Sequence, residues 1–412
     1  MKDAVLQFVS SQLGVSVILA AVVIAVMLGA AAYCIYFERK IAAWIQDRHG
    51  PNRVGPWGLL QLVADGLKFV FKEDVVPGHV DKVLFIAAPA IMVIVALVAF
   101  AAIPWGGQLQ LGGHIVDIQV ASPNIGLLYI LGASSLSVYG VVLGGWASNS
   151  KYSFYGGIRA TAQMLSYEIP LGVCILVVVL TMGTLRLESI TLAQTGYWAG
   201  GWIPQWNVFL HPIAFVVMFI AVLAEANRTP FDLAEAEQEL VGGYHTEYSA
   251  LKFGMFFLAE YAHMMTAGAF ISVLFLGGWH LPFWSLTQAD ATQWYAVIAK
   301  IAVVCAKICG FIFVMMWLRW TLPRFRFDQL MRLCWKSLIP LTLCLLVLTT
   351  GLVYLGKHRD PVWALGGNAV VLLIVLVVAS MKRTTITGRQ RNMSPIGASL
   401  NQLRPPVTEP GG

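Results

Sequence analysis

Long stretches of sequence without a charged residue constrain this chain more than any other feature. A helix needs about 20 residues to cross a bilayer, and the uncharged runs that reach or exceed that length cover 4–37, 83–116, 118–150, 189–224, 261–289, 337–356 and 361–381. The composition agrees, since 58% of the residues are hydrophobic and 12% are charged, whereas a soluble domain has about 25% charged residues. A soluble enzyme and a disordered chain are therefore excluded.

Two further apolar stretches carry internal charges, so the predicted number of membrane spans is nine. Glu168 interrupts residues 160–183, and Lys300 and Lys307 interrupt residues 294–318. We predict an all-α polytopic membrane protein with spans near 15–37, 83–103, 123–147, 160–183, 208–225, 251–276, 294–318, 337–355 and 363–381. The continuous runs exclude an outer-membrane barrel, whose strands alternate apolar and polar residues over about ten positions. The first run is too long for the core of a signal peptide, so we expect it to remain as a helix.

Lysine and arginine collect on one side of the predicted membrane. The loops after the first, third, fifth and seventh spans, together with the C-terminal tail, hold 21 of the 27 basic residues. Because such residues favour the cytoplasmic side, we expect the N-terminus outside and the C-terminus in the cytoplasm. The net charge of +6 then reflects orientation, and no nucleic-acid partner is expected.

The domain organisation follows from the same pattern. Residues 1–382 are predicted to form a single membrane domain, and residues 383–412, with their Pro-Pro and Gly-Gly pairs, a flexible cytoplasmic tail. The six cysteines include no Cys-x-x-Cys pair and no Cys/His cluster, so we predict structural thiols and no metal site.

The loop after the first span, residues 38–82, contains an amphipathic segment. Gly50-Pro51 and Gly55-Pro56 interrupt the loop, and a predicted helix follows them. Its apolar stripe consists of Leu59, Leu62, Val63, Leu67 and Val70, and its other face carries Asp65, Lys68 and Lys72. Such a helix either lies passively in the headgroup layer or forms part of a functional surface that faces the cytoplasm.

Residues 225–247 are unusually acidic. Six carboxylates, Glu225, Asp232, Glu235, Glu237, Glu239 and Glu247, accompany a single basic residue, Arg228. Asp232 and Glu235 have the spacing of a helix cap with its capping-box partner, which is one interpretation. However, a cap needs one or two acids. Mutual repulsion and burial favour protonation of such crowded carboxylates near neutral pH, so we predict a role in holding protons.

Two more acids lie inside predicted spans. Glu168 lies beside Pro170 in the fourth span, and Glu260 lies in the sixth, roughly 14 Å from the start of its helix at 1.5 Å per residue. An ionisable group at that depth costs at least about 2.5–3.5 kcal/mol, so it usually lines a polar pathway. The alternative is a silent pair with Lys300 or Lys307. His263, one turn after Glu260, is interpreted as a packing histidine.

Five groups of motifs then identify a family. They read ERK…QDRHGPNRVGPWGLLQ, SYEIPLG, AEANRTPFDLAEAEQELVGGYHTEYS, FFLAEY and RWTLPRFRFDQLMRLCWK, in this order between residues 33 and 340. On these motifs the chain resembles the H-subunit family of the proton-pumping NADH–quinone oxidoreductases, the bacterial form of respiratory complex I. The resemblance implies a multi-pass component of a translocase in a bacterial inner membrane, with no complete active site in this chain alone.

The resemblance also implies roles for individual residues. The first span, the amphipathic helix and the sixth span would frame a tunnel for a quinone, either ubiquinone or menaquinone. The tunnel residues would be Arg39, Arg48, Asp65, Arg228, Phe231, Asp232, Glu235 and Glu237. A buried proton path would contain Glu168, Glu225, Glu239, Glu247 and Glu260. Contacts to the peripheral arm would come from Arg319, Arg324 and Arg326.

FMN and iron–sulfur clusters would be bound by partner subunits only. Those partners would be the peripheral-arm subunits of the quinone site and the adjacent small membrane subunits. Two alternatives are the homologous membrane subunit of an energy-converting hydrogenase and an independent secondary transporter. A transporter would show internal repeats, which the charged loops do not, and the full motifs at 50–61 and 224–249 favour the quinone enzyme.

Overall fold

The computed structural model describes residues 11–111, 114–198, 201–232 and 242–390. Within this part of the chain, seven helical segments are long and apolar enough to cross a membrane. They are α2 (Gln12–Ile45), α4 (Lys82–Ala99, extended to Ala102 by the short helix η2), α5 (Gly126–Ala147), α6 (Lys151–Met182), α10 (Ala250–Phe275), α11 (Trp294–Thr321) and the continuous segment of α12 (Phe327–Leu333), η6 (Cys334–Leu338) and α13 (Ile339–Tyr354). Two shorter apolar helices, α9 (Pro212–Glu225) and the first part of α14 (Pro361–Gln390), occupy the two remaining predicted spans. The predicted all-α polytopic fold is confirmed.

Short elements connect these helices. They comprise η1 (Pro56–Gly58), α3 (Gln61–Phe71), η2 (Phe100–Ala102), α7 (Leu187–Ala193), α8 (Asn207–Leu210), η4 (Gly243–His245) and η5 (Ser285–Thr287). The strands form two small antiparallel hairpins, β1 (Gln108–Leu111) with β2 (His114–Asp117) and β3 (Tyr197–Trp198) with β4 (Ile203–Pro204).

Several helix boundaries differ from the predicted spans for identifiable reasons. Helix α2 continues eight residues beyond the predicted end at residue 37, and α6 begins nine residues before residue 160. Charged residues ended the predicted spans, although charge does not stop a helix. The fifth span is broken at His211 because Pro212 begins a new helix there. Its main part, α9, has 14 residues, or about 21 Å, which is short of a hydrocarbon layer of about 30 Å.

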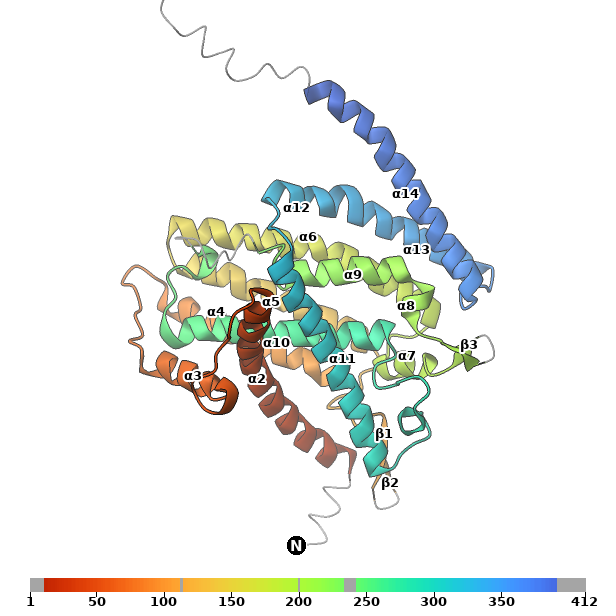
Figure 1. The fold of residues 1–412 in the computed structure, drawn as a ribbon, viewed down its shortest axis with the longest axis horizontal. Helices are drawn as coiled ribbons and strands as arrows, with labels where there is room; N and C mark the ends of the chain where they lie inside the picture. Colours follow the sequence, from red (N-terminus) through yellow and green to blue (C-terminus); the bar gives the residue numbers. More distant parts are fainter. Residues whose placement is uncertain (1–10, 112–113, 199–200, 233–241, 391–412) are drawn as a thin grey trace, which may run out of the picture.

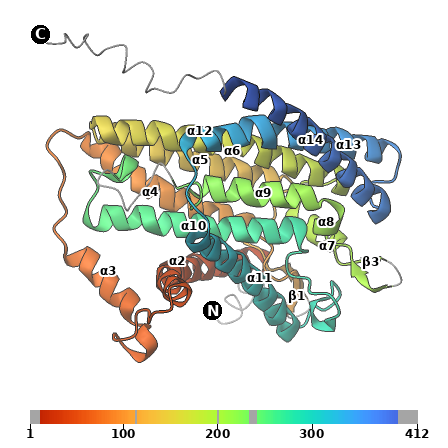
Figure 2. The ribbon, with the colours of Figure 1, turned by 45° about the horizontal axis from the view of Figure 1, so that its top comes forward.

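Helix α10 lies in the middle of the bundle. It packs against α2, α4, α9 and α11, and every residue from 264 to 275 is buried. Helices α4, α5, α6 and α9 run along α10, whereas α11 crosses it obliquely (Figures 1 and 2). The core is therefore built around α10, the helix that carries Glu260 and His263.

Helix α3 lies apart from this bundle, beside α2 and one end of α10 (Figure 2). Its apolar side chains are exposed, with Val63 52%, Leu67 50% and Val70 64% accessible. The predicted amphipathic helix is confirmed, and its apolar stripe is available to lipid or to another apolar molecule. The predicted orientation in the membrane, and the division into a domain at 1–382 and a tail at 383–412, stay predictions.

Candidate functional site

A tight turn at the end of α9 brings the start of the acidic loop into the interior of the bundle. The turn has the hydrogen bonds of a Schellman motif, from Arg228 N to Leu223 O (3.2 Å) and from Asn227 N to Ala224 O (3.4 Å). Asn227 has a left-handed backbone (φ 48°), which asparagine adopts more readily than most residues. Because α9 is short, the turn lies beside the interior of α6 and α10 and not at their ends (Figure 2).

Gln163 of α6 holds this turn in place. Its side chain is fully buried, and Nε2 donates to Ala224 O (2.9 Å), Phe231 O (2.9 Å) and Asn227 Oδ1 (3.1 Å). These bonds tie a carbonyl group in the last turn of α9 to the backbone and side chain of the turn that follows it. The positions of Arg228 and Phe231 are thus set by a side chain from another helix.

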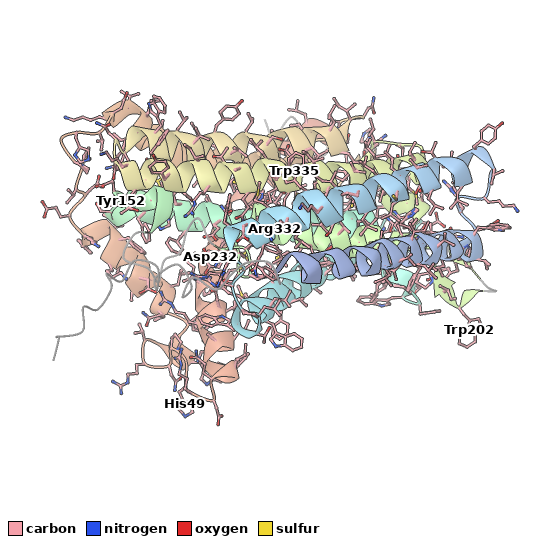
Figure 3. All side chains as sticks on the ribbon, turned by 90° about the horizontal axis from the view of Figure 1, so that it is seen from above. His49, Tyr152, Trp202, Asp232, Arg332 and Trp335 are labelled. Atoms are coloured by element: carbon pink, nitrogen blue, oxygen red, sulfur yellow. The ribbon has the colours of Figure 1, made fainter. Side chains whose placement is uncertain are left out.

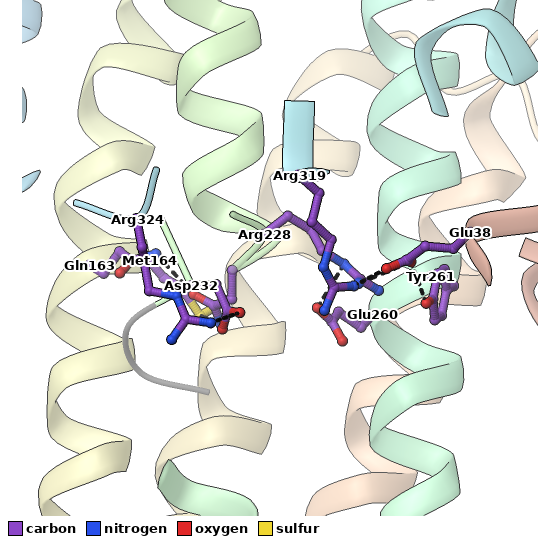
Figure 4. Close-up of polar contacts among 10 residues, drawn as sticks. Glu38, Gln163, Met164, Arg228, Asp232, Glu260, Tyr261, Arg319 and Arg324 are labelled. Atoms are coloured by element: carbon purple, nitrogen blue, oxygen red, sulfur yellow. Dashed lines mark hydrogen bonds and ion pairs between the residues drawn. The ribbon is translucent and has the colours of Figure 1, made fainter. Parts of the chain in front are cut away.

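Arg228 lies at the centre of a buried group of charges. We call Glu38, Arg228, Glu260, Tyr261 and Arg319 the charge cluster (Figure 4). Arg228 Nε is 2.9 Å from Glu260 Oε1, and Arg228 Nη1 is 3.4 Å from Glu38 Oε2. The guanidinium also lies 4.3 Å from the centre of the Tyr261 ring. Glu38 accepts a hydrogen bond from the Tyr261 hydroxyl (2.5 Å) and pairs with Arg319.

The charge cluster is both buried and electrically balanced. Two carboxylates face two guanidinium groups, and the side-chain exposures are 4% for Arg228, 7% for Glu38 and 13% for Glu260. Buried charges are tolerated when they are paired in this way. Screening by water is weak at such burial, so a new charge placed nearby would act strongly on the cluster.

A second buried pair closes the other side of the turn. Asp232 Oδ2 is 3.4 Å from Arg324 Nη2 (Figure 4). The backbone N–H of Phe325 donates to Pro230 O (3.1 Å), and the rings of Phe231 and Phe325 lie 5.7 Å apart. The segment that follows α11 therefore packs onto the segment that follows α9.

A small cavity of about 20 Å³ lies next to the charge cluster. Its lining includes Glu225, Glu260, His263 and Ser137, with apolar residues from α4 and α6. Glu225 Oε1 is 3.6 Å from His263 Nε2. His263 therefore lies beside an acid. This contact was not predicted from the sequence, where His263 was interpreted as a packing histidine.

A third group of charges lies at the C-terminal end of α2. Arg39 Nη1 is 2.5 Å from Asp65 Oδ2, which joins α2 to α3. Arg48 donates to Gln46 and, with Arg39 and the loop at 49–53, lines a wide, open pocket of about 730 Å³. His49 of this loop projects away from the bundle, whereas Asp232 lies among the helices (Figure 3). The predicted tunnel residues therefore fall into two groups, and Glu235 and Glu237 lie outside the described residues.

The predicted proton-path acids have different surroundings. Glu225 and Glu260 line the same cavity, whereas Glu168 accepts a hydrogen bond from Ser135 of α5. Glu247 is half-buried in the segment before α10, and Glu239 lies outside the described residues.

The predicted alternative partners of the intramembrane acids are occupied elsewhere. Lys300 Nζ donates to Ala291 O (2.8 Å), and Lys307 Nζ donates to the carbonyl oxygens of residues 276, 278 and 280. The pairing of Glu168 or Glu260 with these lysines is therefore wrong.

The three arginines assigned to the peripheral arm also differ from one another. Arg326 is exposed, while Arg319 pairs with Glu38 and Arg324 pairs with Asp232. Their contact with a peripheral arm stays a prediction.

Glu38, Tyr261, Gln163 and Ser137 were not identified from the sequence. Glu38 was assigned to a loop because it begins the run Glu38-Arg39-Lys40. A usable signal existed, since neither glycine nor proline occurs between Gly29 and Gly50. An uninterrupted helix over these residues places Glu38 inside it.

Outside the spans, two histidines are buried without an acidic partner in the described part of the chain. Burial lowers the pKa of His245, in η4, to about 4. Burial and, secondarily, the nearby Lys307 lower the pKa of His280 to about 4. Both side chains are neutral at physiological pH, so they fix local packing and carry no charge.

Comparisons with known proteins agree with this picture. The family model for NADH dehydrogenase matches residues 18–350. The chain is 47% identical over 347 residues to the H subunit of NADH-quinone oxidoreductase from Flavobacterium johnsoniae, covering 84% of this chain and 96% of that one. It is 45% identical over 338 residues to an H subunit of NADH-quinone oxidoreductase from Cytophaga hutchinsonii, covering 82% and 96%.

A third relative, an H subunit of NADH-quinone oxidoreductase from Geobacter metallireducens, is 47% identical over 329 residues, covering 80% of this chain and 93% of that one. The matched region of the family model contains the charge cluster and ends before α14. This chain belongs to the NADH dehydrogenase family, together with these H subunits of NADH-quinone oxidoreductases.

Proposed function

We propose that this chain is the quinone-site membrane subunit of a proton-translocating NADH–quinone oxidoreductase in a bacterial inner membrane. The relatives named above are H subunits of NADH-quinone oxidoreductases, and the helices support a multi-pass membrane position. The observation that carries the mechanistic part is the charge cluster, a balanced set of buried ion pairs next to a cavity lined by two acids. None of the matched relatives described above is a hydrogenase or a transporter, so neither alternative is proposed.

The first part of the proposal concerns the path of the quinone. An isoprenoid quinone needs an apolar passage with polar groups where its headgroup stops. Helices α2, α3 and α10 contact one another, the apolar stripe of α3 is exposed, and the pocket beside it contains Arg39 and Arg48. Guanidinium groups donate to carbonyl oxygens and stabilise the negative charge of a reduced quinone. We therefore assign the entrance of the tunnel to this pocket.

The second part concerns coupling. Glu38 and Arg39 are adjacent in α2, and the former belongs to the charge cluster while the latter lines the pocket. A charge that forms 4 Å from a cluster member is worth about 4 kcal/mol at an effective dielectric of about 20. That energy changes the proton occupancy of a carboxylate about a thousandfold. Reduction of the quinone would therefore change the protonation of Glu260 and, through the cavity, that of Glu225.

Other subunits complete the enzyme under this proposal. FMN and the iron–sulfur clusters would be bound by peripheral-arm partners, which would deliver electrons to the quinone. Among the described residues of this chain, no group of three or more His, Cys, Asp or Glu side chains is arranged to hold a metal ion. The chain's own residues would bind the quinone, exclude water around the charge cluster and move protons.

The test is Glu260→Gln in the assembled complex, with Glu73→Gln as a matched change at an exposed acid on the segment after α3. Glu260→Gln removes a carboxylate that would accept a proton, so it should lower NADH–quinone turnover and proton translocation at least about tenfold. A tenfold loss of rate corresponds to about 1.4 kcal/mol in the activation barrier. NADH oxidation by a water-soluble artificial acceptor should stay unchanged in both variants, which reports intact electron entry, and co-purification of the variant chain with the partner subunits reports intact assembly. Full proton translocation in Glu260→Gln would refute the coupling role.

A further inference from the structure

The cavity beside the charge cluster has the size and lining of a site for a water molecule. It measures about 20 Å³, and a cavity of about 10–15 Å³ or more, measured in the same way, holds one water. Helices α4 and α6 contribute apolar walls through Met92, Ala96 and Met164. The polar wall comes from Ser137 on α5, Glu225 on α9, Asn227 in the turn after α9, and Glu260 and His263 on α10. A water needs two to four polar partners, and this lining supplies them.

Ser137 provides independent evidence for such a water. Its side chain is 5% exposed, and its Oγ has no hydrogen-bond partner in the described part of the chain. Serines inside helices usually donate to their own helix, as Ser134 does to Leu131 O (3.0 Å). A buried hydroxyl without a partner is unfavourable. Because Ser137 lines the cavity, a water there would satisfy it.

His263 lines the same cavity as the two acids. Its Nε2 is 3.6 Å from Glu225 Oε1, which is too long for a direct hydrogen bond and suits a bridging water. Glu260 lies three residues earlier on the same face of α10. Arg228 is the cation paired with Glu260, and the lining residues from α4 and α6 are uncharged.

We propose that this cavity holds a water molecule and that His263 and this water carry protons between Glu225 and Glu260. A protonated Glu225 gives its proton through the water to the imidazole and becomes a carboxylate. The imidazolium then gives a proton through the water to the Glu260 carboxylate and returns to its neutral form. One proton has moved, no electron is transferred, and the total charge is unchanged. This inference rests on the proposed coupling function and adds a histidine and a serine to it.

Variants of the full complex test the two residues separately. His263→Gln keeps hydrogen-bonding ability but cannot carry a proton, and Ser137→Val removes the hydroxyl and places a methyl group in the cavity. Ser134→Val, one turn away on the same helix, is the matched control because its hydroxyl bonds to its own backbone. We expect both test variants to lower proton-coupled quinone reduction at least tenfold, and Ser134→Val to change it less than twofold. We also expect the dependence of the rate on pH to flatten in His263→Gln.

Three results separate the inference from the proposed function. If Glu260→Gln is impaired while His263→Gln and Ser137→Val match the wild type in rate and pH profile, the relay is refuted and the coupling function stands. If all three match the wild type, both are refuted. Should a variant fail to assemble, as judged by its co-purification with the partner subunits, an experimental density map of the wild-type complex decides. Density for a water within hydrogen-bond distance of Ser137 Oγ supports the relay, and an empty cavity overturns it.

Discussion

Two ion pairs, one exposed and one inside the bundle, show how burial changes the energy of a contact. Arg39–Asp65 joins α2 to α3 at 2.5 Å, with side-chain exposures of 45% and 20%. Arg228–Glu260 lies inside the bundle at 2.9 Å, with exposures of 4% and 13%. The distances are similar, but water and salt screen the first pair and hardly reach the second. An exposed pair contributes about 0–1 kcal/mol, whereas breaking a buried pair costs about 3–5 kcal/mol.

This difference suits the two positions. A weak pair between α2 and α3 can open and close at little cost, as the entrance that we propose there for a large apolar molecule requires. A strong pair in a dry place keeps its charges and transmits a change in one of them to the others. The distinction that we propose between the entrance and the charge cluster therefore rests on exposure and not on residue type.

The largest expected effect comes from breaking the interior pair. Arg228→Met leaves Glu38 and Glu260 with one fewer buried cation, so we expect a loss of about 3–5 kcal/mol in stability. The complex should assemble poorly or lose activity several degrees below the wild-type temperature, as thermal inactivation of purified membranes would measure. Arg228→Lys is the control, since it keeps the charge and should retain more stability. Equal stability of Arg228→Met and wild type would show that the interior pair resembles the exposed one.

Burial without a charged partner gives the second prediction. Burial lowers the pKa of His245 to about 4, and its ring packs against Tyr244 and Phe253. Between about pH 6.5 and pH 4 the unfolded histidine, with a pKa near 6.5, binds a proton that the folded histidine does not bind. The contribution of neutral His245 to stability is therefore fully present above about pH 6.5 and is lost as the pH falls to about 4. The full loss is about 3 kcal/mol at 1.36 kcal/mol per pKa unit.

Thermal inactivation between pH 7 and pH 4 measures this effect by difference. His245→Gln should remove part of the acid sensitivity, because glutamine does not titrate, while the same change at the exposed His49 should remove none. Identical acid sensitivity of His245→Gln and wild type would contradict the prediction.

The sequence predicts the helices well and their long-range contacts poorly. Apolar runs with few or no charges located the spans because the bilayer excludes charge, and the depth of Glu260 in its span predicted a polar pathway. The pairing of Glu260 with Arg228 was not predicted, because Arg228 follows the predicted fifth span and was expected in a loop. Only the shortness of α9, caused by the break at His211 and Pro212, carries Arg228 into the bundle. Glu38 was missed because a run of charges was taken for the end of a helix.

The smallest expected effect comes from breaking the entrance pair, and it sharpens the comparison most directly. Arg39→Gln should change the free energy of unfolding by less than about 1 kcal/mol, because water solvates both the exposed arginine and the carboxylate that it leaves behind. Its effect should fall instead on the quinone, as a higher KM with little change in the rate at saturating quinone. Raising the salt concentration should reduce the difference between variant and wild type, since an exposed pair is screened.

Arg53→Gln is the control for loss of positive charge alone. Arg53 lines the same pocket and forms no ion pair within the described part of the chain. A fall in the saturating rate of Arg39→Gln as large as that of Glu260→Gln would show that the entrance pair, too, takes part in coupling, and the distinction drawn from exposure would then fail.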